Sequence, residues 1–95
     1  EPAERSLNHI FYYYFKEVSL ELANRISELI LNRIETLSLF YERGRVVDEL
    51  RDLNQNHRYI IEGSFKIIYR EMDDIIYVTD IFPMHMNPEK IKKRN

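Results

Sequence analysis

The stretch from His57 to Phe82 constrains the fold more than any other part of the sequence. It contains three runs rich in Ile, Val, Tyr and Phe, at residues 57–62, 65–70 and 75–82. Residues of these types favour strands, and short polar breaks between such runs favour tight turns. The stretch therefore predicts an antiparallel meander of three strands. The last strand is expected to end at about Phe82, because the following proline cannot extend a central strand.

The two breaks in this stretch differ in strength as turn signals. Gly63-Ser64 places Gly first, which suits a type II′ hairpin turn because that position has a positive φ. Asp73-Asp74 is a weaker signal, since Asp tolerates turn geometry but lacks the freedom of Gly. Two adjacent carboxylates also suggest metal binding, but a plain turn is the favoured interpretation.

Upstream of the meander, apolar residues recur at helical spacing. Pro2 suits the first turn of a helix. One helical face is apolar, with members three or four residues apart: Leu7, Ile10, Phe11, Tyr14 and Val18. Tyr12, Tyr13 and Phe15 add aromatic rings to this face, and a buried stripe is the expected arrangement. A stacking platform for nucleic-acid bases is the alternative.

A second helix is predicted after Ser19, whose hydroxyl can cap it. Its apolar stripe continues the same spacing: Leu22, Ala23, Ile26, Leu29, Ile30, Ile34 and Leu37. Charged residues occupy the opposite face, where Glu21 and Arg25 form a favourable pair four residues apart. Periodicity alone permits one helix from Ala3 to Ser38, which is long for a small domain. We therefore expect a helical hairpin that bends near Ser19.

The remaining segments connect these elements. Gly44 is expected to end the helical region, followed by an extended or irregular link at residues 45–50 and a loop at residues 51–56. The tail after Pro88 is expected to form a short helical turn or to stay mobile. Two helices followed by a meander predict an α+β fold, with a two-helix hairpin packed on an antiparallel β-meander. Residues 1–95 are expected to form a single domain with a basic tail at residues 89–95.

Composition argues against several kinds of site. The sequence has no cysteine, which excludes disulfides, thiolate metal sites and a cysteine nucleophile. It contains neither a Gly-rich phosphate loop nor a His-x-x-x-His pair, so no cofactor and no metal are expected. No apolar run approaches the ~20 residues of a membrane helix. No signal peptide is visible, so a cytoplasmic protein without membrane contact is expected.

Charge is distributed unevenly along the chain. The formal net charge is −2, yet basic residues gather in the tail: Lys90, Lys92, Lys93 and Arg94. A uniform nucleic-acid interface would be basic over a whole face or domain. Any contact with a polyanion is therefore expected to be local.

Alternation along the second predicted strand separates its two faces. Phe65, Ile67 and Tyr69 share one face, and Lys66 shares the other with Ile68 and Arg70. The apolar face is expected to pack against the helices. The face that carries Lys66 is expected to be half exposed.

Three basic residues near this meander form a candidate site. Arg58 begins the preceding strand, Lys66 lies on the second strand, and His85 follows the third. If the strands pair in register, these side chains gather around one concave patch. Lys and Arg stabilise an anionic transition state, and His can transfer protons near neutral pH. The alternative is a half-exposed strand that simply carries long polar side chains.

The order of features resembles a known family. Two amphipathic helices precede the string Gly44-Arg45-Val46-Val47-Asp48-Glu49-Leu50 and then the strand Phe65-Lys66-Ile67-Ile68-Tyr69-Arg70. The ending Asp80-Ile81-Phe82, with Asn87-Pro88 and Lys90, is similar to one branch of the same family. Together these features resemble the RelE/ParE toxins of bacterial type II toxin–antitoxin modules. That family begins with a short strand before the first helix, which this sequence lacks or abbreviates.

The resemblance implies a toxin that inhibits growth, and a module of the kind associated with plasmid stabilization. It also implies a cognate antitoxin from an adjacent gene and a homo- or hetero-oligomer with it. RelE-type toxins cut mRNA on the ribosome, and by resemblance Lys66, His85 and Arg58 would be the catalytic residues of such an mRNA interferase. ParE-type toxins instead block DNA gyrase and have no ribonuclease site.

Departures from the RelE pattern favour the ParE branch. The upstream lysine pair of RelE-type toxins is not reproduced, and no Tyr follows His85. The string that begins at Gly44 also favours the ParE branch. The resemblance therefore implies a gyrase inhibitor, with Lys90, Lys92, Lys93 and Arg94 as partner-binding residues. An endoribonuclease and a degenerate, non-toxic family member are the alternatives.

Overall fold

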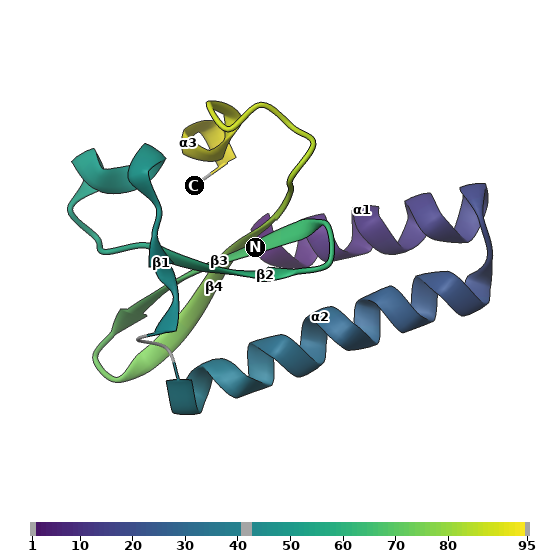
Figure 1. The fold of residues 1–95 in the computed structure, drawn as a ribbon, viewed down its shortest axis with the longest axis horizontal. Helices are drawn as coiled ribbons and strands as arrows, with labels where there is room; N and C mark the ends of the chain where they lie inside the picture. Colours follow the sequence, from purple (N-terminus) through teal and green to yellow (C-terminus); the bar gives the residue numbers. More distant parts are fainter. Residues whose placement is uncertain (1, 41–42, 95) are drawn as a thin grey trace.

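The computed structural model describes residues 2–40 and 43–94. Its elements follow in the order α1 (Pro2–Glu17), α2 (Leu20–Phe40), β1 (Arg45–Val46), the 3-10 helix η2 (Asp48–Leu53), β2 (Arg58–Glu62), β3 (Phe65–Met72), β4 (Ile75–Pro83) and α3 (Lys90–Arg94). The α1–α2 hairpin lies along one side of the sheet, and η2 and α3 lie on the other (Figure 1). The expected α+β fold, with a helical hairpin on an antiparallel meander, is confirmed.

The bend between the two helices lies where the sequence predicts it. The Leu22 backbone N–H donates to the Ser19 hydroxyl oxygen at 3.0 Å, so Ser19 caps α2. The backbone N–H groups of Val18 and Ser19 both donate to the Tyr14 carbonyl, which closes the end of α1. These bonds satisfy groups that a helix end would otherwise leave without partners.

Within the part of the chain that the structure describes, the sheet has four antiparallel strands in the order β1-β2-β3-β4. Strands β2, β3 and β4 form the predicted meander, with a two-residue turn at Gly63-Ser64. Gly63 has a φ of 58°, the sign that a type II′ turn requires at its first central residue. The Asp73-Asp74 turn has φ of 54° and 63°, so both residues are left-handed, as in a type I′ turn.

The link before the meander agrees with the sequence in one part and differs in another. Residues Arg45–Val46 of the predicted extended or irregular link are extended and form strand β1, although its pairing of Arg45 with Tyr59 adds a fourth strand that was not predicted. Part of the predicted loop is the 3-10 helix η2, which ends at Leu53. Leu50 of this helix, and Val47 just before it, are buried in a cluster with Ile68 of the sheet.

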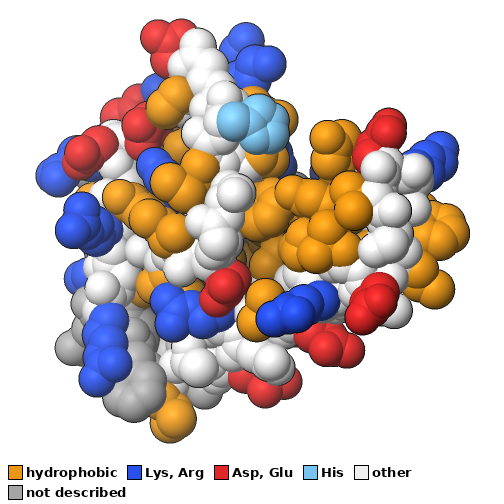
Figure 2. Space-filling model, turned by 45° about the vertical axis from the view of Figure 1, so that its right-hand side comes forward, with side chains coloured by type: hydrophobic (Ala, Val, Ile, Leu, Met, Phe, Trp, Pro, Cys, Tyr) orange, Lys and Arg blue, Asp and Glu red, His pale blue; other side chains and the backbone are white. Residues whose placement is uncertain are grey.

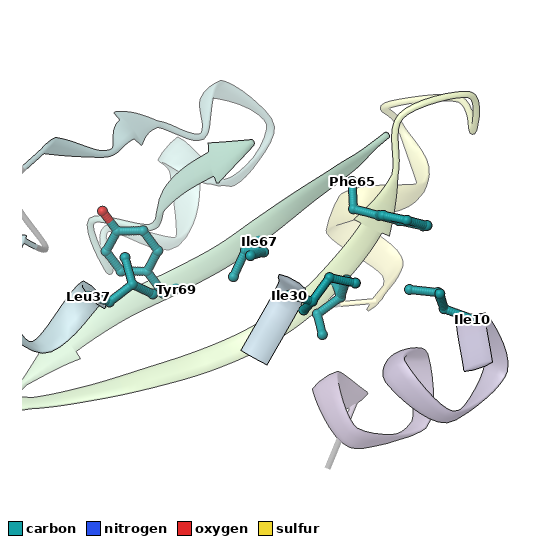
Figure 3. Close-up of a cluster of buried hydrophobic side chains, with 7 residues drawn as sticks. Ile10, Ile30, Leu37, Phe65, Ile67 and Tyr69 are labelled. Atoms are coloured by element: carbon teal, nitrogen blue, oxygen red, sulfur yellow. The ribbon is translucent and has the colours of Figure 1, made fainter. Parts of the chain in front are cut away.

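The main core lies between the helical hairpin and the sheet. Figure 3 shows Ile10 of α1 and Ile30 and Leu37 of α2 directed toward Phe65, Ile67 and Tyr69 of β3. Ile67 and Tyr69 are fully buried, so the predicted apolar face of this strand is confirmed. Burial of one such side chain contributes ~1.5–3 kcal/mol to folding.

A second core covers the opposite face of the sheet. Its buried members come from four elements and the link before η2: Val47, Leu50, Ile68, Phe82 and Ile91. The expectation that the Lys66 face is half exposed holds only in part, because η2 and α3 bury Ile68 completely. Packing of Ile91 also decides between the two expectations for the tail, which forms the helix α3.

Several aromatic residues of α1 were expected in the core and are exposed. Tyr12, Tyr13 and Phe15 expose 57%, 60% and 45% of their surface, and Val18 exposes 59%. Leu29 of α2, placed in the predicted stripe, is also exposed. Consecutive residues of a helix point in different directions, so one face cannot hold them all. The end of the hairpin also extends beyond the sheet, which leaves its side chains without a cover (Figure 1).

Candidate functional site

The structure separates two of the three basic residues that the sequence suggests as a site. Arg58 pairs with Tyr69, and Lys66 pairs with Phe82, in the sheet register. Directly paired residues share a face of the sheet. Arg58 therefore lies on the side of the helical hairpin, and Lys66 lies on the side of α3. The expected single patch does not form on either face.

Arg58 and Lys66 each have a partner inside the protein. Arg58 Nη1 donates to the Gly44 carbonyl oxygen at 2.8 Å, which ties β2 to the segment before β1. Lys66 Nζ lies 4.6 Å from the centroid of the Tyr59 ring, a cation–π contact. These contacts account for the positions of both side chains as parts of the sheet, and a catalytic role is not needed to explain them.

His85 lies apart from Arg58 and Lys66. It lines an open groove between α1 and the end of β4 with the chain that follows. The groove has a volume of about 830 Å³ and three walls: Ile10, Tyr13 and Tyr14 with His9; Gly63, Ser64 and Phe65; and Pro83, Met84, His85 and Met86. Figure 2 shows hydrophobic side chains gathered around a hollow on this side of the molecule. The groove is therefore mainly an apolar surface, with a histidine in each of two walls.

The basic tail is divided between internal and external contacts. Lys92 forms an ion pair with Asp52 of η2, and this hydrogen bond lowers the pKa of that exposed carboxyl. Arg94 turns inward, where its Nη2 lies 2.8 Å from Asp80 Oδ1. Lys90 and Lys93 are exposed. Of the four residues suggested for partner binding, these two present their charge to solvent most directly.

Asp80 is the centre of a buried polar network that the sequence reasoning missed. Its side chain is fully buried, and the Ser6 hydroxyl donates to its Oδ1 at 2.9 Å. Arg94 Nη2 donates to both Ser6 Oγ and Asp80 Oδ1, so the three residues join α1, β4 and α3. An acidic residue inside a mostly apolar strand was the signal, because buried carboxylates are rare unless they are paired.

Burial also changes the titration of two other side chains. His57 is 4% exposed, and its Nδ1 has no hydrogen-bond partner among the described residues. Desolvation, with a smaller effect of the nearby Arg70 charge, lowers the pKa of His57. Burial raises the pKa of Tyr69, although its hydrogen bond with the Gly44 backbone opposes the change. A Cβ at Gly44 would collide with the Tyr69 hydroxyl, so glycine is required there by close approach.

The comparison with protein families identifies the chain. The model of the ParE toxin of the type II toxin–antitoxin system parDE matches residues 1–88. This chain is a member of the ParE toxin family. It is therefore the toxin of a type II toxin–antitoxin system, and its family implies an antitoxin partner. The resemblance found in the sequence to the RelE/ParE superfamily is confirmed.

No curated protein shows significant similarity to this ParE-family toxin. Within residues 2–40 and 43–94, no helix is both long enough and apolar enough to cross a membrane. The family match ends at residue 88, so helix α3 lies outside it.

Proposed function

We propose that this ParE-family toxin acts in the cytoplasm as a binding inhibitor of DNA gyrase, and that its antitoxin, encoded by an adjacent gene, neutralises it. The family match over residues 1–88 is the observation that carries the proposal. A binding inhibitor needs an exposed, shaped surface and no assembled set of catalytic groups. The exposed hairpin end, the apolar groove and the free lysines of α3 are surfaces of that kind.

The positions of the basic residues favour binding over ribonuclease chemistry. A ribonuclease must activate the ribose hydroxyl, stabilise the phosphorane charge and protonate the leaving oxygen at one point. Arg58 and Lys66 lie on opposite faces of the sheet, and each has an internal contact. Loss of one electrostatic group from such a site costs ~10²–10³-fold in rate. Groups that do not converge on one phosphate would therefore support little cleavage.

The exposed lysines of α3 supply the proposed polar part of the gyrase contact. Lys90 and Lys93 face solvent, whereas Arg94 is held by Asp80 and Lys92 is paired with Asp52. Exposed charges attract an acidic partner surface and are screened by salt. The affinity for gyrase is therefore expected to fall as ionic strength rises.

The test is a paired assay of gyrase supercoiling and of ribosome-dependent mRNA cleavage by the purified toxin. We expect inhibition of supercoiling by the wild type and by the Lys66→Ala/His85→Ala variant alike. A Lys90→Gln/Lys93→Gln variant is expected to inhibit supercoiling less. Both lysines are exposed, so this variant should keep the fold, which the far-ultraviolet circular dichroism spectrum checks.

Other results of the paired assay would overturn the proposal. Strong mRNA cleavage that the Lys66→Ala/His85→Ala variant loses, with supercoiling untouched, would identify a RelE-like endoribonuclease. Absence of both activities, together with normal growth on expression without the antitoxin, would identify a family member that has lost its toxicity.

A further inference from the structure

A second concave site lies where the two ends of the described chain meet. Arg5, Ser6 and His9 of α1 face Lys93 and Arg94 of α3 around a pocket of about 310 Å³. Arg5 and His9 are four residues apart, so they lie on the same face of α1. The pocket therefore draws basic side chains from two helices into one small volume.

The floor of this pocket is a hydrogen-bonded network. Ser6 is buried, and its hydroxyl donates to Asp80 and accepts from Arg94. The Arg94 side chain also lies over the Phe82 ring, 5.2 Å from its centroid, and Arg94 Nη1 lies 3.4 Å from Met86 Sδ. The Arg94 side chain is thus held by contacts with α1, with β4 and with the chain that follows β4.

The rim of the pocket carries two positive charges that have no ion-pair partner among the described residues. Asp80 balances the charge of Arg94 beneath the pocket. Arg5 and Lys93 are exposed, and neither has an ion-pair partner among residues 2–40 and 43–94. Two unbalanced positive charges therefore remain beside the imidazole of His9. This concentration stands out in a chain whose formal net charge is −2.

The geometry points to a phosphate-binding site formed by Arg5, His9 and Lys93, with the Ser6–Arg94 pair as its floor. A phosphate monoester carries about −1.5 to −2 charges at neutral pH, which matches the two unbalanced cations. A single carboxylate would leave one of them without a counter-charge. Tetrahedral phosphate oxygens also accept hydrogen bonds from several directions, which suits donors on two helices. Guanidinium groups are favoured partners of phosphate for this reason.

Phosphate at this site would join α1 to α3. Arg5 and His9 belong to the first helix, and Lys93 belongs to the last, so one ligand would bridge the two. A ligand that binds only the folded state stabilises it in proportion to its occupancy. The bound anion would therefore hold α3 against the sheet and keep Ile91 in the second core. This inference does not depend on gyrase being the target.

The test is a titration of the toxin with sodium phosphate at neutral pH and constant ionic strength, followed by backbone amide chemical shifts. We expect saturable shifts confined to residues 5–9 and 90–94. Arg5→Gln and Lys93→Gln should each weaken binding about tenfold or more, because each removes a charge-assisted hydrogen bond. Both side chains are exposed, so the variants should fold.

Matched variants separate a site from general attraction. Lys90→Gln removes a charge from the same helix outside the pocket, and Arg25→Gln removes one from α2; each should change affinity by less than about twofold. Equal losses for Lys90→Gln and Lys93→Gln would overturn the proposal, as would shifts that never saturate. Acetate that binds as tightly as phosphate would also overturn it, and would instead indicate a pocket for an acidic peptide.

An oligonucleotide with a terminal phosphate identifies the source of the ligand. Tighter binding of this probe than of inorganic phosphate, lost when the terminal phosphate is removed, would support the site and assign it to a nucleic-acid end. Binding equal to that of inorganic phosphate would support the site as one for the free anion or a small phosphate ester.

Discussion

His57 is a histidine that folding removes from water, and no group among the described residues forms a hydrogen bond with its Nδ1. Its lowered pKa makes the stability of the fold depend on pH. Below the ordinary value of 6.5, the His57 ring binds a proton in the unfolded chain, whereas the same ring remains neutral in the folded chain. The free energy of unfolding should therefore decrease as the pH falls below that value, until the folded pKa is passed.

Urea denaturation between neutral and mildly acidic pH checks this prediction. His57→Gln keeps a polar side chain but cannot titrate, so its stability should change less over the same interval. The exposed Asp52 carboxyl does not confuse the result, because its pKa is lowered from 3.8 and its effect lies in a more acidic range. A wild type and a His57→Gln variant with identical pH profiles would contradict the prediction.

The Asp73-Asp74 turn places two non-glycine residues in the left-handed region. Asp tolerates this conformation, but Gly adopts it without a steric penalty. Asp74→Gly should therefore raise the free energy of unfolding by about 0.5–1 kcal/mol. The Asp74 backbone N–H that donates to Glu71 is kept in this variant.

The control for the turn prediction is Asp74→Ala, which removes the same charge but keeps a Cβ. It should not stabilise the protein. Gly63→Ala should lower the free energy of unfolding by about 1 kcal/mol, because Gly63 has a φ of 58°, which strains a residue that has a Cβ. A Cβ at this position would contact no other atom within 4 Å, so backbone strain is the expected cause of the loss. Stabilisation by Asp74→Ala equal to that by Asp74→Gly would assign the effect to charge instead.

At the scale of elements, strand β3 is covered on both faces. Ile67 packs under the helical hairpin, and Ile68 packs under η2 and α3. A five-residue helix is not stable alone, so α3 depends on its burial of Ile91 and on the Arg94–Asp80 ion pair. Ile91 of the tail is therefore part of the second core.

Two alanine substitutions measure this two-sided burial. Ile67→Ala and Ile68→Ala should each lower the free energy of unfolding by ~2–5 kcal/mol, because both leave a cavity. Ile61→Ala, on an exposed position of β2, should cost less than about 0.5 kcal/mol. Urea denaturation gives all three values. An Ile68→Ala cost as small as that of Ile61→Ala would mean that α3 and η2 do not cover the sheet in solution.

The whole molecule exposes apolar surface at two adjoining places. Tyr12, Phe15 and Val18 are exposed at the end of the hairpin, and Tyr13 lines the groove of about 830 Å³. Exposed apolar patches of this kind are typical of protein interaction sites. The family implies an antitoxin partner, and a segment of that partner that covers the hairpin or a sheet edge would remove this surface from water.

Co-expression with the neighbouring reading frame should therefore yield a stable complex that is more soluble than the toxin alone. Within the complex, amide hydrogen exchange should slow in α1 or along a sheet edge. Tyr13→Ala should weaken the complex about tenfold or more, as expected for a buried aromatic anchor. Arg25→Ala, on the charged face of α2, should not. Recovery of free toxin alone would count against this prediction.

Local patterns in the sequence were sufficient for most of the framework. Runs rich in Ile, Val, Tyr and Phe between short polar breaks predicted β2, β3 and β4, Gly63 predicted a hairpin turn, and Ser19 predicted the helical bend. Each prediction depends on neighbours in the chain, because strand alternation, turn conformation and capping are settled within a few residues. The family resemblance followed from the order of the same local features.

Contacts between distant residues could not be read in this way. The sequence placed Arg58, Lys66 and His85 in one patch, whereas strand register puts Arg58 and Lys66 on opposite faces. The sequence also left the role of Asp80 open. Arg94 becomes the ion-pair partner of Asp80 only when α3 packs onto the sheet. Residue type and spacing determine which side of an element is apolar. Which other element covers that side depends on tertiary packing. Many arrangements of the elements bury a similar apolar area, so the contacts between distant residues decide which arrangement forms.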